Sequence, residues 1–200
     1  MSHQSFLWFR YSFLHRLLFA ASIAFASCIA AAQEKYVDSD ELLKLIVNVD
    51  LKNGDAATQT RFEANVHELM NRSNAREPLA MHNYGWYRFR ICVVLKNTGV
   101  SVESAPMCTQ ALADLRALAM NTEYAIVFVV PSAMSILGEM YRDGIGTKAS
   151  HYLASDWFIR SSQQRSSNGD REGAIRALEE ALRLVPDHPS GADLRKQLLK

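Results

Sequence analysis

The spacing of apolar residues is helical through almost the whole chain after Tyr36. Apolar side chains recur every three or four residues, and no stretch alternates cleanly between apolar and polar positions. This spacing places them on one face of a helix, whereas a half-buried strand would show a period of two. The pattern predicts an all-α fold.

Turn residues divide this pattern into helices joined by short connections. Helices joined so closely pack antiparallel, which predicts a series of helical hairpins. Pro78 and Pro106 suit the first turn of a helix, because proline lacks only an amide hydrogen that is unused there. The expected helices begin near Asp38, Asp55, Pro78, Pro106, Ser132, Ala149, Arg171 and Ala192.

Tyr124–Val130 is the exception to the helical pattern. It is rich in β-branched and aromatic residues, which favour a strand, and Pro131 follows it. The sequence offers no second strand to pair with it. We therefore expect a buried extended segment, or a short helix that leads into the helix from Ser132 to Tyr141.

The N-terminus has the residue order of a secretory signal peptide. Arg10 and Arg16 precede an apolar run, Leu17–Ala32, that ends in small residues. Cleavage near Ala32 predicts a mature protein that is periplasmic in a Gram-negative bacterium, or secreted, and that has no membrane span.

Two alternatives to cleavage remain open. Acylation of Cys28 would anchor the protein as a lipoprotein, and an uncleaved signal would tether the same soluble region to the membrane. Both would keep the protein in an exported location.

Charged residues are balanced and interspersed. The chain has 22 Lys and Arg against 21 Asp and Glu, and the expected signal contains two arginines and no acidic residue. A nucleic-acid partner requires a concentrated basic face, so this distribution argues against one. The length of the mature chain suits a single domain.

Two cysteines of the expected mature chain flank a turn-like stretch. Cys92 and Cys108 lie symmetrically about Asn97–Pro106, on the two arms of an expected hairpin. Facing positions of packed helices have about the Cα separation that a disulfide requires, and an oxidising compartment favours the bond. We predict a disulfide, with two buried free thiols as the alternative.

Near the C-terminus, the segment GDREGAIRALEEALRLVPDHP carries a recognisable motif. Ala174 and Ala181 flank Leu178, and Pro186 ends the helix. This spacing resembles the second helix of a tetratricopeptide repeat. The small residues let a neighbouring helix approach closely.

The preceding segment resembles a Sel-like repeat, a variant with a longer glycine-bearing turn. LGEMYRDGIG at Leu137–Gly146 is followed by YLASDWFIRSS at Tyr152–Ser162. The family usually has a pair of small residues, commonly alanines, where this chain has Ser161 and Ser162. Together the two motifs are defined by Leu137, Gly138, Tyr141, Gly144, Gly146, Ala154, Trp157, Phe158, Ala174, Leu178, Ala181 and Pro186.

Helix pairs that recur in this way predict an α-solenoid, in which each pair buries its apolar face against the next. One domain over residues 33–200 would then contain five parts. These are an atypical capping pair at 33–75, a divergent repeat at 77–121, a Sel-like repeat at 132–165, a tetratricopeptide-like unit at 154–189 and a C-terminal helix at 190–200.

Candidate catalytic and metal-binding residues are few. His67 and Glu68 begin the sequence HELMN, which lacks the second histidine of a zinc-protease helix. We expect neither an enzyme nor a bound metal or cofactor. Two groups of scattered residues have structural explanations: His82, His151 and His188 as surface or turn residues, and Asp143, Asp156 and Asp170 as turn residues or helix caps.

The expected third helix carries large apolar residues all round, so they cannot all face one neighbour. Solenoids bind peptides or helices in a groove lined by the first helices of successive pairs. Trp86, Tyr87, Arg88 and Arg90 are the candidate lining of such a groove. A helix sandwiched between two neighbours is the alternative.

The resemblance and the signal together imply an exported scaffold or adaptor that binds a protein or peptide partner and performs no catalysis. Two other functions stay open. One is a membrane-tethered assembly factor for an envelope or secretion complex, and the other is a small enzyme or cell-wall-acting factor built on a repeat platform.

Overall fold

The computed structural model describes residues 38–48, 54–121 and 128–198. The chain divides into two units, residues 1–38 and 39–200, and every helix in the described ranges belongs to the second. The expected signal, residues 1–32, lies outside the described residues, and so does Cys28.

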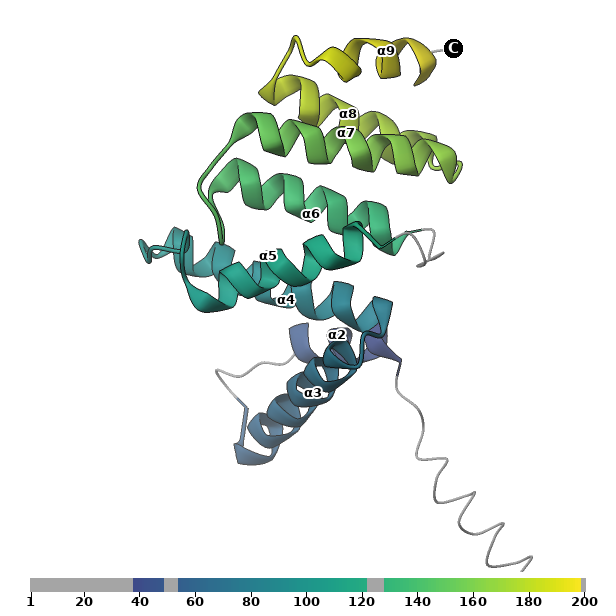
Figure 1. The fold of residues 1–200 in the computed structure, drawn as a ribbon. Helices are drawn as coiled ribbons and strands as arrows, with labels where there is room; N and C mark the ends of the chain where they lie inside the picture. The colour runs from purple at the N-terminus through teal and green to yellow at the C-terminus, as the bar shows by residue number, and fades with distance from the viewer. Residues whose placement is uncertain (1–37, 49–53, 122–127, 199–200) are drawn as a thin grey trace, which may run out of the picture. The chain divides into compact units, whose positions relative to one another are not determined.

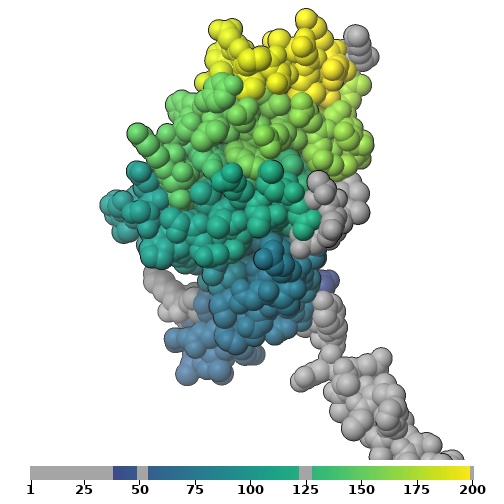
Figure 2. Space-filling view, viewed as in Figure 1, coloured from purple at the N-terminus to yellow at the C-terminus, as the bar shows by residue number. Residues whose placement is uncertain are grey.

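The described residues form eight α-helices and no strand (Figure 1), so the prediction of an all-α fold is confirmed. Each helix packs against the next along the chain, and successive helices run antiparallel. Figure 2 shows successive segments as successive bands of the surface. The helices are α2 (Ser39–Val47), α3 (Ala56–Asn74), α4 (Pro78–Asn97), α5 (Pro106–Ala119), α6 (Val129–Asp143), α7 (His151–Ser167), α8 (Arg171–Leu184) and α9 (Pro189–Leu198).

Two helices begin three residues earlier than the sequence predicts. α6 starts at Val129, and Pro131 fits within its first turn, where no amide hydrogen is needed. A strand is therefore wrong for Val129 and Val130, while Tyr124–Val127 lie outside the described residues. α9 starts at Pro189 instead of Ala192 for the same reason, because proline suits the first helical position.

Helix α4 separates two apolar cores. The smaller core contains Ile46, Leu69, Ala80 and Tyr84 and lies between α4 and the first hairpin, α2 and α3. The larger core extends from α4 to α9. Because both cores use α4, the helix is sandwiched, which explains why its sequence is apolar on more than one side.

The turn after α6 depends on two glycines. Gly144 and Gly146 both have a φ of 68°, in the left-handed region that glycine adopts without strain. A Cβ on Gly146 would lie 2.3 Å from the backbone oxygen of Cys108, so the turn passes directly against the start of α5. The amide of Gly146 also donates to the carbonyl of Val102 at 2.9 Å.

Two hairpins share a device for close helix packing. In α4, a Cβ on Gly85 would lie 2.8 Å from the side chain of Leu115 in α5. In α6, a Cβ on Gly138 would lie 2.8 Å from the ring of Phe158 in α7. In each pair a glycine on the first helix makes room for a large residue on the second, so the two hairpins repeat one packing solution.

Helix α7 is joined to both neighbours by buried serines. Ser161 donates to the carbonyl of Pro131 in α6 at 2.7 Å, and Ser162 donates to the carbonyl of Ala174 in α8 at 2.7 Å. Both serines are fully buried. The two serine hydroxyls therefore supply hydrogen bonds from α7 to both of its neighbours.

Some helices also contact the helix two places farther along the chain. α2 contacts α4 and α4 contacts α6, and farther along α7 contacts α9. α7 thus belongs to the hairpin with α6 and also to the hairpin with α8. The overlap of the two repeat motifs at residues 154–165 falls on this shared helix.

Candidate functional site

One face of α4 points toward α6 and carries polar and aromatic residues four positions apart. His82 bonds to Ser132 of α6, and Arg90 acts electrostatically on Glu139 of α6. Between them Trp86 packs against the larger core, and the Arg90 guanidinium lies 5.7 Å from the centre of its ring. His82, Trp86 and Arg90 therefore form a stripe along the face of α4 that contacts α6.

The structure does not bring the four candidate groove residues together. Tyr87 packs against the smaller core, on the side of α4 that faces the first hairpin. Arg88 lies over the ring of Tyr84 at 4.1 Å and pairs with Asp114 of α5 at 2.8 Å. Adjacent helical residues point about 100° apart. Of the four, Trp86 and Arg90 belong to the stripe, whereas Tyr87 and Arg88 belong to other contacts.

Charged residues continue this stripe from α6 to α8. Arg142 bonds to the Asp143 carboxylate at 2.9 and 2.8 Å, and its guanidinium lies 3.7 Å from Glu180 of α8. Lys96 of α4 donates to the backbone carbonyl of Asp143. We use the term charged surface for Trp86, Arg90, Glu139, Arg142 and Glu180. Arg90 stacks on Trp86, Arg142 pairs with Glu180, and both arginines act electrostatically on Glu139.

The acidic groups of this region have opposite pKa shifts. Burial raises the pKa of Glu139, with Arg142 opposing the shift. The hydrogen bonds from Arg142 lower the pKa of Asp143. Burial thus favours the neutral form of Glu139, and a ligand that brings a positive charge would stabilise its ionised form.

A second polar cluster joins three helices at the other end of the stripe. Asn83 donates from Nδ2 to Oδ1 of Asp40 in α2 at 2.8 Å. Nδ1 of His82 lies 2.9 Å from Oδ1 of Asn83, and Nε2 of His82 lies 2.8 Å from Oγ of Ser132 in α6. Burial lowers the pKa of His82. His82 was expected at the surface, and its half-buried position between α2 and α6 corrects that expectation.

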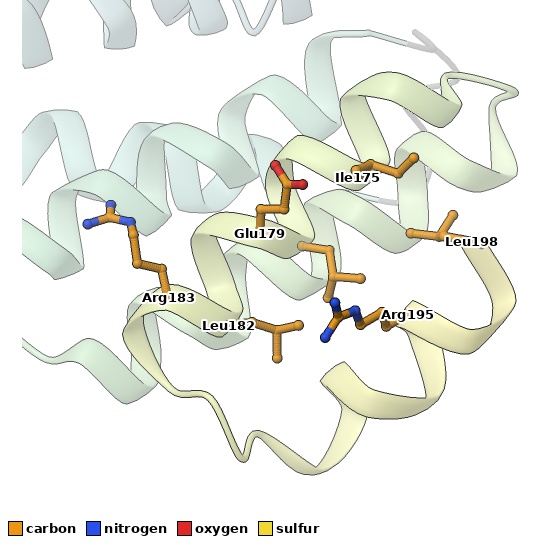
Figure 3. Close-up of a pocket in the computed structure, with 7 residues that line it drawn as sticks. Ile175, Glu179, Leu182, Arg183, Arg195 and Leu198 are labelled. Atoms are coloured by element: carbon orange, nitrogen blue, oxygen red, sulfur yellow. The ribbon is translucent and has the colours of Figure 1, made fainter.

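A hollow of about 360 Å³ lies between α8 and α9 (Figure 3). Apolar side chains from both helices form most of its lining, while Glu179, Arg183 and Arg195 supply charge. Arg183 is already paired with Glu180. The lining therefore offers apolar area and one arginine, Arg195, but no converging set of reactive groups.

The cysteine pair forms the predicted disulfide. Sγ of Cys92 in α4 lies 2.03 Å from Sγ of Cys108 in α5, and the Cα atoms are 5.9 Å apart. Both residues are fully buried. Gly146 packs on Cys108 and donates to the carbonyl of Val102. The disulfide therefore holds in place the connection between α4 and α5 against which the turn after α6 packs.

The residues of the two repeat motifs mostly lie in the larger core. Gly138 and Phe158 meet across the α6 and α7 contact, and Pro186 lies just after α8 and is exposed. The motif residues that belong to the larger core are Leu137, Tyr141, Ala154, Trp157, Phe158, Ala174, Leu178 and Ala181.

The remaining titratable candidates make local contacts. Asp170 caps α8 by accepting from the amide of Gly173 at 2.9 Å, as expected. Asp156 does not cap a helix, because it lies within α7 and contacts His188 at 3.0 Å. Asp143 ends α6 and pairs with Arg142, so it is not a helix cap either. His188 is a turn residue, but it is buried and not at the surface.

On the helix that contains HELMN, the polar side chains pair within the helix. His67 Nδ1 lies 3.1 Å from Nδ2 of Asn71, and Glu68 pairs with Arg72 at 2.7 Å. In the ranges 38–48, 54–121 and 128–198, no group of three or more His, Cys, Asp or Glu side chains is placed to hold a metal ion.

Comparisons with protein-family models, with curated proteins and with solved structures each found no match. Among the helices of the described residues, none combines the length and the apolar character needed to cross a membrane.

Sequence reasoning missed the residues of α6 and α8 that complete the stripe. Ser132, Glu139 and Glu180 are common residue types in amphipathic helices, and nothing in their spacing marks them. A weak signal was present in α4, where His82, Trp86 and Arg90 recur at intervals of four and therefore share one face.

Proposed function

We propose that the protein is an exported helical-repeat scaffold that binds a segment of a partner protein on the charged surface. The role itself requires no catalysis. The observation that carries the proposal is that charged residues of three helices act on one another: Arg90 stacks on Trp86 in α4, Arg142 of α6 pairs with Glu180 of α8, and both arginines act electrostatically on Glu139.

The composition of the charged surface suits binding. Trp and Arg are enriched among residues that dominate protein interfaces, because each offers a large contact area and directed polar atoms. Arg90 is exposed, and Trp86 is only partly buried beneath it. Acidic and basic groups alternate along the surface, so a partner segment with the complementary alternation would be selected over one of uniform charge.

We further propose that the repeats are tetratricopeptide-like and Sel-like. The paired devices at Gly85 with Leu115 and at Gly138 with Phe158 support this, because both permit close packing of the two helices of one unit. In such families partner identity depends on the residues grafted onto the frame and not on the frame itself.

Export is the proposed location. The buried Cys92 and Cys108 disulfide supports it, since such bonds persist in oxidising compartments. Labelling of cells with a fatty-acid analogue separates a cleaved signal from a lipid anchor. Incorporation that disappears in Cys28→Ala would favour the membrane-tethered assembly factor instead.

Site-specific photocrosslinking in the cells that make the protein tests the binding surface. A benzophenone amino acid at Arg90 is expected to capture one discrete partner, whereas the same group at exposed Gln163 of α7 is not. Arg142→Glu should reduce the Arg90 cross-link while the helical circular dichroism signal stays unchanged. Equal cross-linking from both positions, or none from Arg90, would contradict the proposal.

A further inference from the structure

The polar cluster at α2, α4 and α6 has a defined hydrogen-bond direction. The Asp40 carboxylate can only accept, so the contact at 2.8 Å requires the amide nitrogen of Asn83. The amide oxygen of Asn83 then faces Nδ1 of His82 at 2.9 Å and must accept a hydrogen bond from it. Asp40 thereby sets the amide orientation, and Asn83 sets the histidine tautomer.

This tautomer leaves Nε2 of His82 as an acceptor. In a neutral imidazole one nitrogen donates and the other accepts, so the Ser132 hydroxyl donates to Nε2 across 2.8 Å. Burial lowers the pKa of His82 from 6.5, which keeps the ring neutral at pH 7. The Ser132 hydroxyl therefore donates to a base, His82, whose orientation Asn83 and Asp40 fix.

We propose that Ser132 is an activated nucleophile that accepts an acyl group from a carboxylic ester, with His82 as its base and Asn83 as the positioning residue. A serine, a histidine base and an orienting group in hydrogen-bond contact are the arrangement that acyl transfer requires. The activity is independent of partner binding on the charged surface, which lies farther along the stripe.

The position of Ser132 within α6 adds to the case. Ser132 is the fourth residue of the helix, and helical side chains lean toward the N-terminus, so its hydroxyl lies over the first turn. The amides of Val129 and Val130 in that turn have no acceptor within the helix, and a helix N-terminus stabilises negative charge. Negative charge that develops on the ester carbonyl oxygen during the attack would be favoured near this end of the helix.

The reaction balances with the groups present. Oγ of Ser132 attacks the carbonyl carbon, and its proton passes to Nε2 of His82. The bond to the alkoxide oxygen breaks, and His82 returns the proton so that an alcohol leaves. Water then attacks the acyl-serine with His82 again as base, which releases the carboxylic acid and restores Ser132.

Fluorophosphonate labelling of the full chain tests the proposal, because this probe transfers its phosphonyl group to activated serines with loss of fluoride. Peptide mass spectrometry is expected to place the label on Ser132. Ser132→Ala should remove it, and His82→Gln should slow labelling by about 100-fold or more. Ser135→Ala is the matched control on the same helix, since Ser135 bonds to Ser161 and not to a histidine, and it should label normally.

A pH profile distinguishes an activated serine from a purely structural hydrogen bond. The labelling rate should fall as the pH drops below the inflection of His82, which lies under 6.5. Folded wild-type protein that leaves Ser132 unlabelled, or that labels equally after His82→Gln, would overturn the proposal. The wild-type measurement needs no variant, so it tests the proposal even where a substituted protein fails to fold.

Discussion

Gly138→Ala is the most direct test of how the hairpins pack. Gly138 lies in α6 beneath the ring of Phe158, and a Cβ there would come within 2.8 Å of two ring carbons and 2.9 Å of a third. Ordinary contacts begin near 3.4 Å. The ring is only 3% exposed, so it cannot move aside into solvent. The added methyl group must therefore push helices α6 and α7 apart or force the ring off its rotamer.

Two effects of opposite sign determine the magnitude. Overpacking a tight core costs about 1–3 kcal/mol. Alanine favours a helix over glycine by about 1 kcal/mol, which offsets part of that cost. We expect a net loss of about 1–2 kcal/mol in the free energy of unfolding, and each kcal/mol lowers the Tm of a domain of this size by about 2–4 °C.

Urea unfolding followed by circular dichroism measures this loss. Gly191→Ala in α9 is the control, because the one close contact of its Cβ, at 2.5 Å, would be with the end of the flexible Leu182 side chain, which can turn away, while the next atoms are at 3.5 Å or more. The control should be nearly neutral. Adding Phe158→Leu to Gly138→Ala should cost less than the two single changes together. A Gly138→Ala protein as stable as wild type would refute the packing argument.

Three further changes test the disulfide, His82 and the hydrogen bond from Ser162 to α8. Replacing Cys92 and Cys108 together with alanine should lower the free energy of unfolding by about 3 kcal/mol, measured in urea, because the bond closes a 16-residue separation. Burial lowers the pKa of His82, so below about pH 6.5 the unfolded chain takes up a proton more readily than the folded protein does. The free energy of unfolding should therefore decrease as the pH is lowered through this range, and His82→Gln should flatten that dependence in urea melts. Ser162→Ala removes the bond to the Ala174 carbonyl and should cost about 1 kcal/mol by thermal melting, while an unchanged Tm would contradict that bond.

Much of the fold follows from local patterns. Each of the eight described helices overlaps an expected segment and begins within about three residues of the expected start, with the starts at Pro78, Pro106 and Arg171 predicted to the residue. The disulfide was predictable because a hairpin places positions equidistant from its turn opposite each other. The glycine turn was predictable because only glycine adopts positive φ at both Gly144 and Gly146 without strain.

The candidate sites were less predictable, because a helical period shows which residues share a face and not what that face meets. Trp86 and Tyr87 are neighbours in the chain, yet they pack against different cores. Arg142 meets Glu180 only because α6 and α8 lie close enough for long side chains to span them.

The sequence by itself thus determined the helices, their starts to within about three residues, and the disulfide, because each depends on residues near one another in the chain. Only the tertiary structure decided the contacts between helices. His82 and Ser132 are 50 residues apart, and neither carries a local signal of the other. Their meeting depends on how far α4 and α6 slide along each other where they pack, and the local sequence of neither helix determines that offset.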